Sequence, residues 1–339
     1  MDMGTLRKLG KEKFGTACRV CRICDGTACA GEIPGMGGVS TGRSFINNLS
    51  ALSSVKLRQR IIHEVGEPDT NCEFFGVKMQ APIIAAPIGG ISYNCNDFMP
   101  EEDYAKTIVE GANTADCLAM TGDGGPPVIY KSGIEAITLA GGRGIPTIKP
   151  RPNEEIIKQA AIGIKAGAPA IAIDVDSAAL INMTRMNQPV GPKSPKELEQ
   201  LVEQIERPLI IKGVMTVEDA QLCLAAGVKG IVVSNHGGRV LDHTPGTAEV
   251  LPAIAAAVGG KMLVLVDGGI RTGTDVLKML ALGADAVMIG RPLTQAAAGG
   301  AQGVAFVLEK IITELKLAMI MTGVKDIAAI NYAIIHKNC

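Results

Sequence analysis

Eight short apolar runs rich in β-branched residues, separated by helix-length segments, constrain the fold of this chain more than any other feature. We predict strands at residues 82–87, 117–121, 146–149, 170–176, 209–212, 230–235, 262–267 and 286–290. Alternation of this kind favours parallel strands joined by crossover helices. Eight such units predict an α/β fold, a closed (β/α)8 TIM barrel. An open doubly wound sheet would need a topological switch point, and nothing in the sequence marks one.

Helical segments are expected between these strands, and signals at their ends agree with the unit count. The expected helices include residues 101–114, 153–166, 195–205, 216–226, 247–258 and 272–281. Ser194 precedes a proline and Thr216 stands three residues before an aspartate, which is typical of helix starts. Gly167, Gly227 and Gly283 follow helix ends, where a left-handed residue is favoured.

The chain divides into a segment before the first strand and the barrel itself. Residues 1–80 are expected to form a cysteine-containing cap, and residues 81–339 to form the barrel with C-terminal helices. The longest connection from a strand to a helix lies between Asp176 and Pro195, on the face where barrel enzymes keep their active-site loops. This connection is a candidate lid.

Charge and hydropathy exclude some classes of partner. The 339 residues carry a formal net charge of −1 and contain no basic block, so neither nucleic acid nor a membrane is expected as a partner. The expected partner is a small molecule. The first residues lack the apolar run of a signal peptide, and no long uncharged apolar stretch follows, which favours a cytoplasmic location.

Charged residues of the predicted strands lie almost entirely at the C-terminal ends, which predicts an active site there. Two glycine-rich loops follow, at residues 267–271 and 290–292. Their glycines let backbone N–H groups approach an anion, and their arginines supply charge and paired donors. The two loops therefore predict a phosphate site.

Lys212, His236 and Arg239 stand at the ends of the fifth and sixth strands. A buried Lys212 needs an anionic partner, and either a flavin that gains charge on reduction or a structural carboxylate would serve. A neutral His236 can accept a proton near physiological pH, and Arg239 can clamp a carboxylate through paired hydrogen bonds. The position of His236 beside an arginine on a glycine loop favours a catalytic role.

The segment from Leu209 to Pro292 resembles the FMN-dependent 2-hydroxy acid oxidases and dehydrogenases, the family of glycolate oxidase, lactate oxidase and flavocytochrome b2. The resemblance rests on IKGVMTVEDAQLCLAAGVKGIVVSNHGGRVLD and VDGGIRTGTDVLKMLALGADAVMIGRP. It continues weakly to Ile330, and a fainter likeness between Phe45 and Pro87 includes the start of APIGG. It implies FMN-dependent oxidation of a small (S)-2-hydroxy acid, lactate-like or glycolate-like, to the 2-keto acid.

The resemblance also implies roles for individual residues. His236 would be the base, Arg239 would hold the substrate carboxylate, Asp176 would stabilise the His236 imidazolium, and Lys212 would lie beside flavin N1. Residues that would bind FMN are Ala86, Pro87, Gly89, Thr121, Thr147, Lys212, Ser234, Asp267, Gly268, Gly269, Arg271, Gly290 and Arg291. The acceptor that reoxidises the flavin is left open between oxygen and a carrier. A homo-oligomer, a tetramer as in relatives, is expected.

The substrate half of the site departs from the family pattern. A tyrosine expected near the N-terminus has no counterpart, and the third strand reads PTIKP, so Thr147 and Lys149 replace a glutamine and a tyrosine. Asp174 replaces a threonine. Lys149 would contact a second anionic group of the substrate or would neutralise Asp174, and the second interpretation is favoured.

Four cysteines near the N-terminus lie outside the family pattern. Cys18, Cys21, Cys24 and Cys29 form the motif C-x2-C-x2-C-x4-C. Short thiolate spacings of this kind can bind zinc or an iron–sulfur cluster. Unligated thiols in a capping segment are the alternative, and the sequence leaves both open.

Two other functions compete with the oxidoreductase. One is a non-redox FMN isomerase of the type 2 isopentenyl diphosphate isomerase kind, which shares the barrel but needs no His236 and Arg239 in this loop. The other is a flavin electron-transfer or binding module without a substrate pocket, which the missing tyrosines and the cysteine motif would suit.

Overall fold

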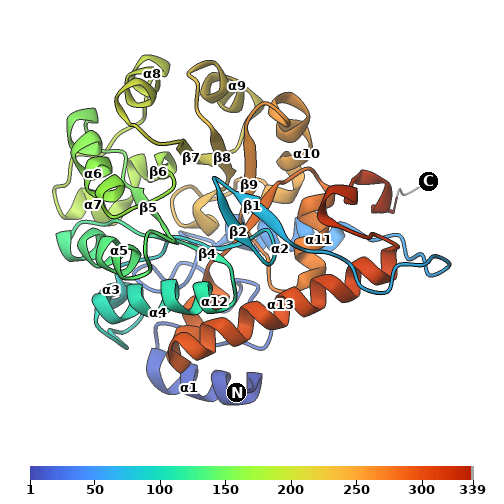
Figure 1. Ribbon diagram of the computed structural model, residues 1–339. Helices are drawn as coiled ribbons and strands as arrows, with labels where there is room; N and C mark the ends of the chain where they lie inside the picture. Colours follow the sequence, from blue (N-terminus) through green and yellow to red (C-terminus); the bar gives the residue numbers. More distant parts are fainter. Residues whose placement is uncertain (337–339) are drawn as a thin grey trace.

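The structure, a computed structural model, describes residues 1–336 and confirms the predicted (β/α)8 barrel (Figure 1). The last three residues of the predicted segment 81–339 lie outside the described residues. Eight parallel strands close in the order β10-β3-β4-β5-β6-β7-β8-β9. They are β3 (Ile83–Ala85), β4 (Leu118–Thr121), β5 (Ile145–Ile148), β6 (Ile171–Asp174), β7 (Leu209–Val214), β8 (Gly230–Val233), β9 (Leu263–Val266) and β10 (Ala286–Ile289).

Helices surround the barrel, and each helix predicted from the sequence begins and ends within one residue of its expected position. The helices between strands are α3 (Ile91–Asn94), α4 (Glu101–Thr114), α5 (Pro127–Leu139), α6 (Asn153–Lys165), α7 (Ile181–Arg185), α8 (Pro195–Gln204), α9 (Val217–Ala225), α10 (Thr247–Val258) and α11 (Gly273–Ala281). The Ser194 and Thr216 hydroxyls accept hydrogen bonds from the backbone N–H groups three residues later, as caps should. Gly167, Gly227 and Gly283 are left-handed, as predicted.

The chain after the barrel is helical, and short 3₁₀ turns complete the structure. Helices α12 (Arg291–Ala296) and α13 (Gly300–Thr322) follow β10, and α13 crosses the outside of the barrel (Figure 1). The 3₁₀ turns are η1 (Val175–Ala179), η2 (His236–Gly238), η3 (Ala297–Gly299), η4 (Ile327–Ala329) and η5 (Tyr332–Ile334).

Three predicted strands run two residues past the observed carboxyl end, and the first of them, predicted at 82–87, ends at Ala85. The strand predicted at 170–176 ends at Asp174, whose ψ of 70° takes the backbone out of the extended region, and Asp176 lies in η1. The strand predicted at 230–235 ends at Val233, so Ser234 and Asn235 belong to the following loop. These two strands end where polar residues begin, at Asp174 and at Ser234, and the predictions run past these residues.

Alternation along the strands decides which side chains enter the barrel. Near the amino ends the interior is apolar and includes Ile84, Leu118, Ile145, Ala170, Ile210, Val232, Leu265 and Ala286. Because successive side chains point to opposite faces, residues two or four positions further along the chain point inward again. At that level the side chains are polar on the neighbouring strands β5, β6 and β7 and directly after β9, at Thr147, Asp174, Lys212 and Asp267. The strand register thus places the site at the carboxyl end.

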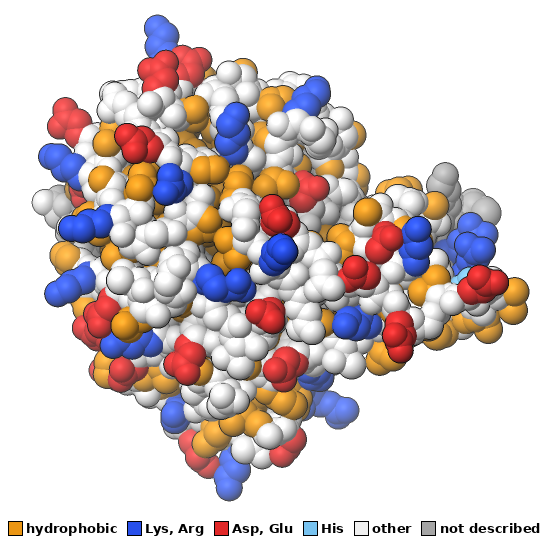
Figure 2. All heavy atoms as spheres, viewed as in Figure 1, with side chains coloured by type: hydrophobic (Ala, Val, Ile, Leu, Met, Phe, Trp, Pro, Cys, Tyr) orange, Lys and Arg blue, Asp and Glu red, His pale blue; other side chains and the backbone are white. Residues whose placement is uncertain are grey.

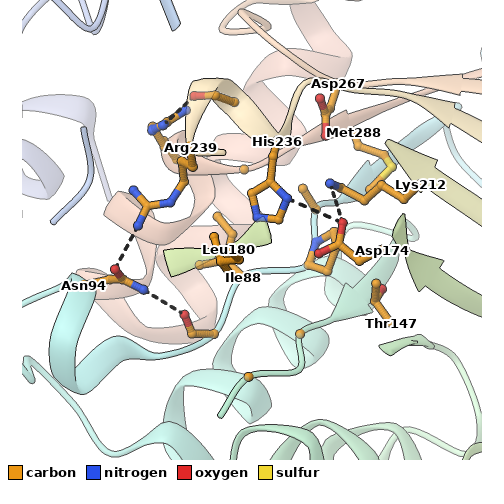
Figure 3. A pocket seen from close by; sticks show the side chains of 18 of the residues that line it. Ile88, Asn94, Thr147, Asp174, Leu180, Lys212, His236, Arg239, Asp267 and Met288 are labelled. Carbon is orange, nitrogen blue, oxygen red and sulfur yellow. Dashed lines mark hydrogen bonds and ion pairs between the residues drawn. The ribbon is translucent and has the colours of Figure 1, made fainter. Parts of the chain in front are cut away.

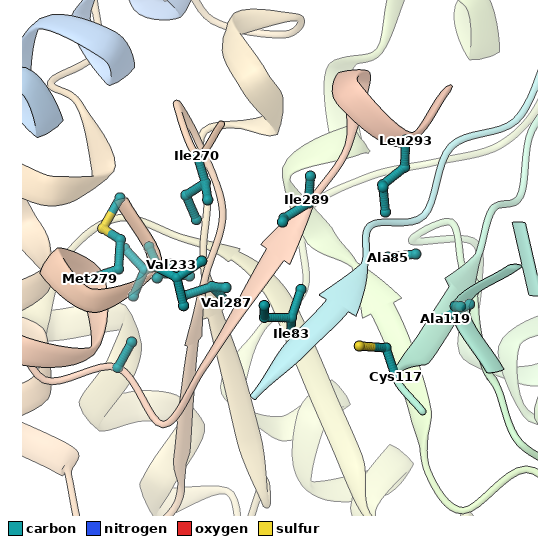
Figure 4. Packing of buried hydrophobic residues seen from close by; sticks show 14 of the residues in the cluster. Ile83, Ala85, Cys117, Ala119, Val233, Ile270, Met279, Val287, Ile289 and Leu293 are labelled. Carbon is teal, nitrogen blue, oxygen red and sulfur yellow. The ribbon is translucent and has the colours of Figure 1, made fainter. Parts of the chain in front are cut away.

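Outward-facing strand residues pack against the helices and close the barrel between its first and last strands. Ile83 and Ala85 on β3 lie beside Val287 and Ile289 on β10, and all four are buried (Figure 4). Leu293 on α12 covers the same seam. Burial of these side chains removes apolar surface from water and holds the two strands in register.

A two-stranded hairpin that the sequence analysis did not predict closes the amino end of the barrel. Strands β1 (Cys72–Phe74) and β2 (Val77–Met79) pair antiparallel and lie across the barrel (Figure 1). Phe74 and Met79 are buried and pack against the apolar interior residues. Access to the interior is therefore blocked at this end by apolar packing.

The remainder of residues 1–80 contains two helices and a long irregular segment. Helix α1 (Met3–Phe14) packs beside α12 and η3, and α2 (Arg43–Ser54) packs against α10. The side-chain amide of Asn48 on α2 exchanges hydrogen bonds with that of Asn235, at 2.8 Å and 3.1 Å. Within the predicted capping segment 1–80, only residues 15–42, between the helices, are meant by the cap from here on. The backbone of this cap contacts arginines of the barrel loops.

The face shown in Figure 2 carries Lys, Arg, Asp and Glu side chains of both signs interspersed, and no single sign dominates it. In the described part of the chain, residues 1–336, every helix is too short or too polar to span a membrane.

Gly273 is expected to be essential for packing α11 against α13. A Cβ at this position would lie 2.0 Å from the backbone nitrogen of Leu315 and 2.4 Å from the carbonyl carbon of Glu314. Gly273→Ala should therefore lower the free energy of unfolding by about 3 kcal/mol, measured by urea denaturation. Gly66→Ala is the matched control because a Cβ there meets nothing within 4 Å. Equal stability losses in the two variants would contradict this packing.

Candidate active site

A large cavity opens at the carboxyl ends of the barrel strands, with about 1180 Å³ of empty space including its mouth. Cofactor and substrate sites in proteins commonly occupy cavities of this order. The predicted site residues that line it are Ala86, Pro87, Gly89, Thr147, Lys149, Lys212, His236, Arg239, Asp267, Gly268, Gly269, Arg271, Gly290 and Arg291. Leu180 and Met183, from the connection predicted as a lid, also line it.

Three predicted site residues lie behind the cavity wall instead of in it. Asp176 lies behind two lining residues, 2.9 Å from Nδ1 of His236 and 3.5 Å from Nζ of Lys212. Ser234 donates a hydrogen bond of 2.8 Å to Oδ2 of Asp267. Thr121 is buried against Gly133 of α5, and Gly122 takes its place in the lining. The sequence placed these residues at the correct end of the barrel but could not fix which way each side chain points.

A buried carboxylate between two ammonium groups forms the centre of the site. Asp174 Oδ2 lies 2.6 Å from Nζ of Lys149, and Asp174 Oδ1 lies 2.9 Å from Nζ of Lys212 (Figure 3). The register of the sheet creates this row, because Asp174 on β6 stands directly beside Lys212 on β7. Burial alone would raise the pKa of Asp174, but the two ammonium groups outweigh burial and hold that pKa well below its ordinary value.

The contacts of Lys149 support the interpretation that it neutralises Asp174. Besides the carboxylate, its Nζ donates to the buried Ser177 hydroxyl at 2.8 Å. Burial would lower the pKa of the second ammonium, Lys212, but Asp174 and Asp176 raise it above its ordinary value, so Lys212 stays charged. Asp174, Asp176 and His236 also place three ligand atoms within 4.8 Å of one another. The two ammonium groups already supply the positive charge that a metal ion would bring there.

His236 is oriented by Asp176 and by an unusual backbone. Its Nδ1 lies 2.9 Å from Oδ1 of Asp176, and its other ring nitrogen, Nε2, has no partner among residues 1–336. The residue has a φ of 56°, a left-handed conformation that is uncommon for a non-glycine residue and typical of functional loops. Gly213 makes room for this pair, because a Cβ on Gly213 would lie 2.5 Å from Cβ of Asp176.

Arg239 is fixed by main-chain carbonyls of the cap. Its Nη1 donates to the carbonyl oxygens of Gly35 and Gly37 at 2.7 Å and 3.0 Å, and its Nη2 donates to Oδ1 of Asn94 at 2.9 Å (Figure 3). No Asp or Glu of the described residues forms an ion pair with it. Burial lowers its pKa, and the positive charge faces the cavity without a carboxylate partner. Such a side chain is suited to bind an anionic group of a ligand.

The loops after β9 and β10 contain two arginines and glycines with a left-handed backbone. Gly268 and Gly269 have φ values of 95° and 82°, and the cavity also touches Arg271 and Arg291. Burial, followed by repulsion from Arg239 and Arg271, lowers the pKa of Arg291 to about 9. An anion bound here would relieve this repulsion. The geometry fits the phosphate site predicted from these loops.

Several cavity residues that the sequence analysis missed come from segments outside the predicted site loops. Tyr93 and Asn94 come from the short helix α3, Met36 from the cap, and Asp123 from the loop after β4. Asp123 forms a buried ion pair with Arg151 at 3.2 Å. Tyr93, Asn94 and Asp123 follow predicted strands closely, so their position was a signal that could have found them. Met36 gave no comparable signal, because it reaches the cavity from the irregular cap.

Comparison with known proteins decides the family. The FMN-dependent dehydrogenase family matches residues 36–193 and 185–337. This chain belongs to that family. An L-lactate dehydrogenase from Ectopseudomonas mendocina is 32% identical over 354 residues, covering 89% of this chain and 93% of the relative. A human 2-hydroxyacid oxidase 2 is 31% identical over 327 residues, covering 87% and 90%.

Solved structures of family members share the fold over almost the whole chain. A mandelate oxidase variant with 2-hydroxy-phenylacetamide superposes with a TM-score of 0.79 at 28% identity, covering 96% of both chains. Another mandelate oxidase variant, solved with the monooxide FMN adduct, has a TM-score of 0.73 at 31% identity, covering 89% and 96%. The protein is an FMN-dependent 2-hydroxy acid oxidase or dehydrogenase, and neither the isomerase nor the binding-module alternative is supported.

The cavity of this family member fits FMN on its own evidence. Three buried polar atoms of the lining have no hydrogen-bond partner within the described chain, namely Oγ1 of Thr147, Oδ1 of Asp267 and Nε of Arg271. Buried polar groups are rarely left unpaired in folded proteins, so these atoms indicate a polar ligand. The left-handed glycines and the crowded arginines indicate where the phosphate of that ligand would be held.

The ion pair between Lys149 and Asp174 is expected to show strong coupling in a double-mutant cycle. Lys149→Met and Asp174→Asn should each lower the free energy of unfolding by about 3 kcal/mol, because each leaves a buried charge with fewer partners. The double variant should lose less than the sum by at least about 1 kcal/mol. Urea denaturation at neutral pH measures all four proteins. Additive losses would contradict direct pairing.

Proposed function

We propose that this protein oxidises a small (S)-2-hydroxy acid, lactate-like or glycolate-like, with His236 as the base and Arg239 as the group that binds the substrate carboxylate. The observation that carries the proposal is that two groups from one loop line one cavity. They are the Nε2 of His236, which has no hydrogen-bond partner among residues 1–336, and the guanidinium of Arg239, which has no carboxylate partner in that part of the chain. The names of relatives, among them L-lactate oxidase and 2-hydroxyacid oxidase, support this substrate class.

FMN would be held at its phosphate by the loops with Gly268, Gly269, Arg271 and Arg291. Lys212 and Thr147, deeper in the barrel, would contact its ring system. When bound, FMN supplies the acceptor for the two electrons removed from the substrate. The fixed positive charge of Lys212 would lie beside the ring system and would favour its reduction, because the reduced ring system gains negative charge.

The protein's own groups handle binding and the proton. Arg239, positioned by the cap carbonyls, would bind the substrate carboxylate through paired hydrogen bonds and so orient the CH–OH group. His236 Nε2 would accept the proton released when that group becomes a carbonyl. Asp176, already 2.9 Å from Nδ1, would stabilise the resulting imidazolium, and Asp174 Oδ1 at 3.6 Å adds further negative charge.

The walls of the cavity favour a substrate with a short apolar side chain. Ile88 and Leu180 lie below His236 and Arg239 in Figure 3. Met183 and Tyr93 add further apolar surface to the lining. Contacts of this kind suit a methyl or a small alkyl group. The cytoplasmic location and the homotetramer expected from the sequence remain proposals.

Replacing the base should abolish flavin reduction without releasing the flavin. For His236→Gln, we expect FMN content to be unchanged and the rate of anaerobic flavin bleaching by L-lactate or glycolate to fall at least about 100-fold. Stopped-flow absorbance measures the rate. His243→Gln is the control, because its side chain is 69% exposed and lies outside the cavity. The proposal fails if no 2-hydroxy acid bleaches the wild-type flavin, or if His236→Gln bleaches at the wild-type rate.

Replacing the clamp should weaken substrate binding in a graded way. Arg239→Met removes the charge and both donors, and we expect kcat/KM to fall by about 50-fold or more. Arg239→Lys keeps the charge but loses the paired geometry, so it should fall between Arg239→Met and the wild type. FMN content, read from the visible spectrum, confirms that each variant is loaded. Identical kcat/KM values for both variants and the wild type would rule out the clamp.

A further inference from the structure

The four cysteines of the N-terminal motif converge on a second cavity, separate from the catalytic one. Cys18, Cys21, Cys24 and Cys29 all line it, together with Met36 and Arg291. Cys18 is buried and the other three are partly buried, and none of the four is in a disulfide. No helix or strand aligns these four thiols, because they come from an irregular loop. Their convergence on one cavity therefore indicates a shared binding site.

Hydrogen-bond donors are directed at the sulfur atoms of two of these cysteines, Cys18 and Cys24. The backbone N–H of Val20 lies 3.4 Å from Sγ of Cys18, and the Gln295 amide lies 3.3 Å from the same sulfur. The Arg271 guanidinium lies 3.7 Å from Sγ of Cys24. Donors and a cation at this distance would offset the negative charge of thiolates bound to a metal, because thiolates are strong hydrogen-bond acceptors. Thiolates are the form of cysteine that binds metals.

The spacing of the sulfurs distinguishes a single ion from a cluster. Four thiolates around one zinc ion, at about 2.3 Å from it, come within about 3.8 Å of one another. Within residues 1–336, no three of these sulfurs lie within 4.8 Å of one another. In a [4Fe–4S] cluster each thiolate binds a different iron, so the sulfurs are spread around a larger group. The wider arrangement around a cavity fits the cluster.

The cysteine cavity adjoins the flavin cavity. The side chains of Met36 and Arg291 line both of them. Residues just beyond the cysteines also connect the two, because the carbonyls of Gly35 and Gly37 hold Arg239 and the carbonyl of Met36 accepts from Nε of Arg291 at 2.8 Å. A group that fastened the four cysteines would therefore fasten the backbone that positions both arginines.

We propose that Cys18, Cys21, Cys24 and Cys29 bind a [4Fe–4S] cluster that fixes the cap over the flavin site. The cluster would add a fixed centre to this irregular segment, since residues 15–42 contain no helix or strand. The proposal stands apart from the oxidation chemistry, because metal content and cap order are measured without substrate.

Metal and sulfide analysis of the holoprotein tests the site. We expect the protein prepared without oxygen, from cells supplied with iron, to contain about four iron atoms and about four acid-labile sulfides per chain. Reduction by dithionite should produce an electron paramagnetic resonance signal of a reduced cluster. One zinc ion per chain, or no metal in the anaerobically prepared protein, would overturn the proposal.

Cysteine variants assign the ligands and the role. Cys21→Ala and Cys24→Ala should lose at least three quarters of the iron while retaining FMN, and Cys72→Ser, on the hairpin at the other end of the barrel, should keep the wild-type content. Trypsin should cleave after the exposed Arg19 and Arg22 at least tenfold faster in the two cap variants than in Cys72→Ser. Unchanged iron in the cap variants would refute the ligand set. Equal cleavage rates would refute the fastening role.

Discussion

The buried carboxylate of Asp174 between two ammonium groups is the interaction on which the rest of the site depends. It joins three neighbouring strands of the barrel, since Lys149 follows β5, Asp174 ends β6 and Lys212 lies on β7. The negative charge of Asp174 lets Lys212 remain charged inside a barrel whose amino half is apolar. His236 and Asp176 then stand beside this charged row, so the proton acceptor and the electrostatic environment come from one arrangement.

A second constraint acts from outside the barrel. Backbone carbonyls of the cap accept hydrogen bonds from Arg239 and Arg291, and no carboxylate of residues 1–336 forms an ion pair with either, which leaves their charge available to ligands. Main-chain carbonyls can do this only if the cap backbone is fixed. The four cysteines precede these carbonyls in the chain, the last of them, Cys29, by six residues. The order of the cap backbone therefore decides how well the two arginines are positioned to bind ligands.

The sequence predicted the barrel well because its signals are local: β-branched runs, helix caps and glycine ends each mark one unit. It also predicted which residues stand at the carboxyl ends of strands. It could not predict the directions of Thr121, Ser234 and Asp176, because these depend on where each strand turns. The hairpin at residues 72–79 and the hold of the cap on Arg239 were missed because they arise from contacts between distant segments.

The hairpin residues Phe74 and Met79 limit the route by which substrate and product can move, because they close the amino end of the barrel. Because these side chains block the amino end of the barrel, the active-site cavity opens only at the carboxyl ends of the strands, where the cap lies. The hydroxy acid must then enter, and the keto acid must leave, through the same opening. Both molecules carry a carboxylate, so the cavity would bind only one of them at a time.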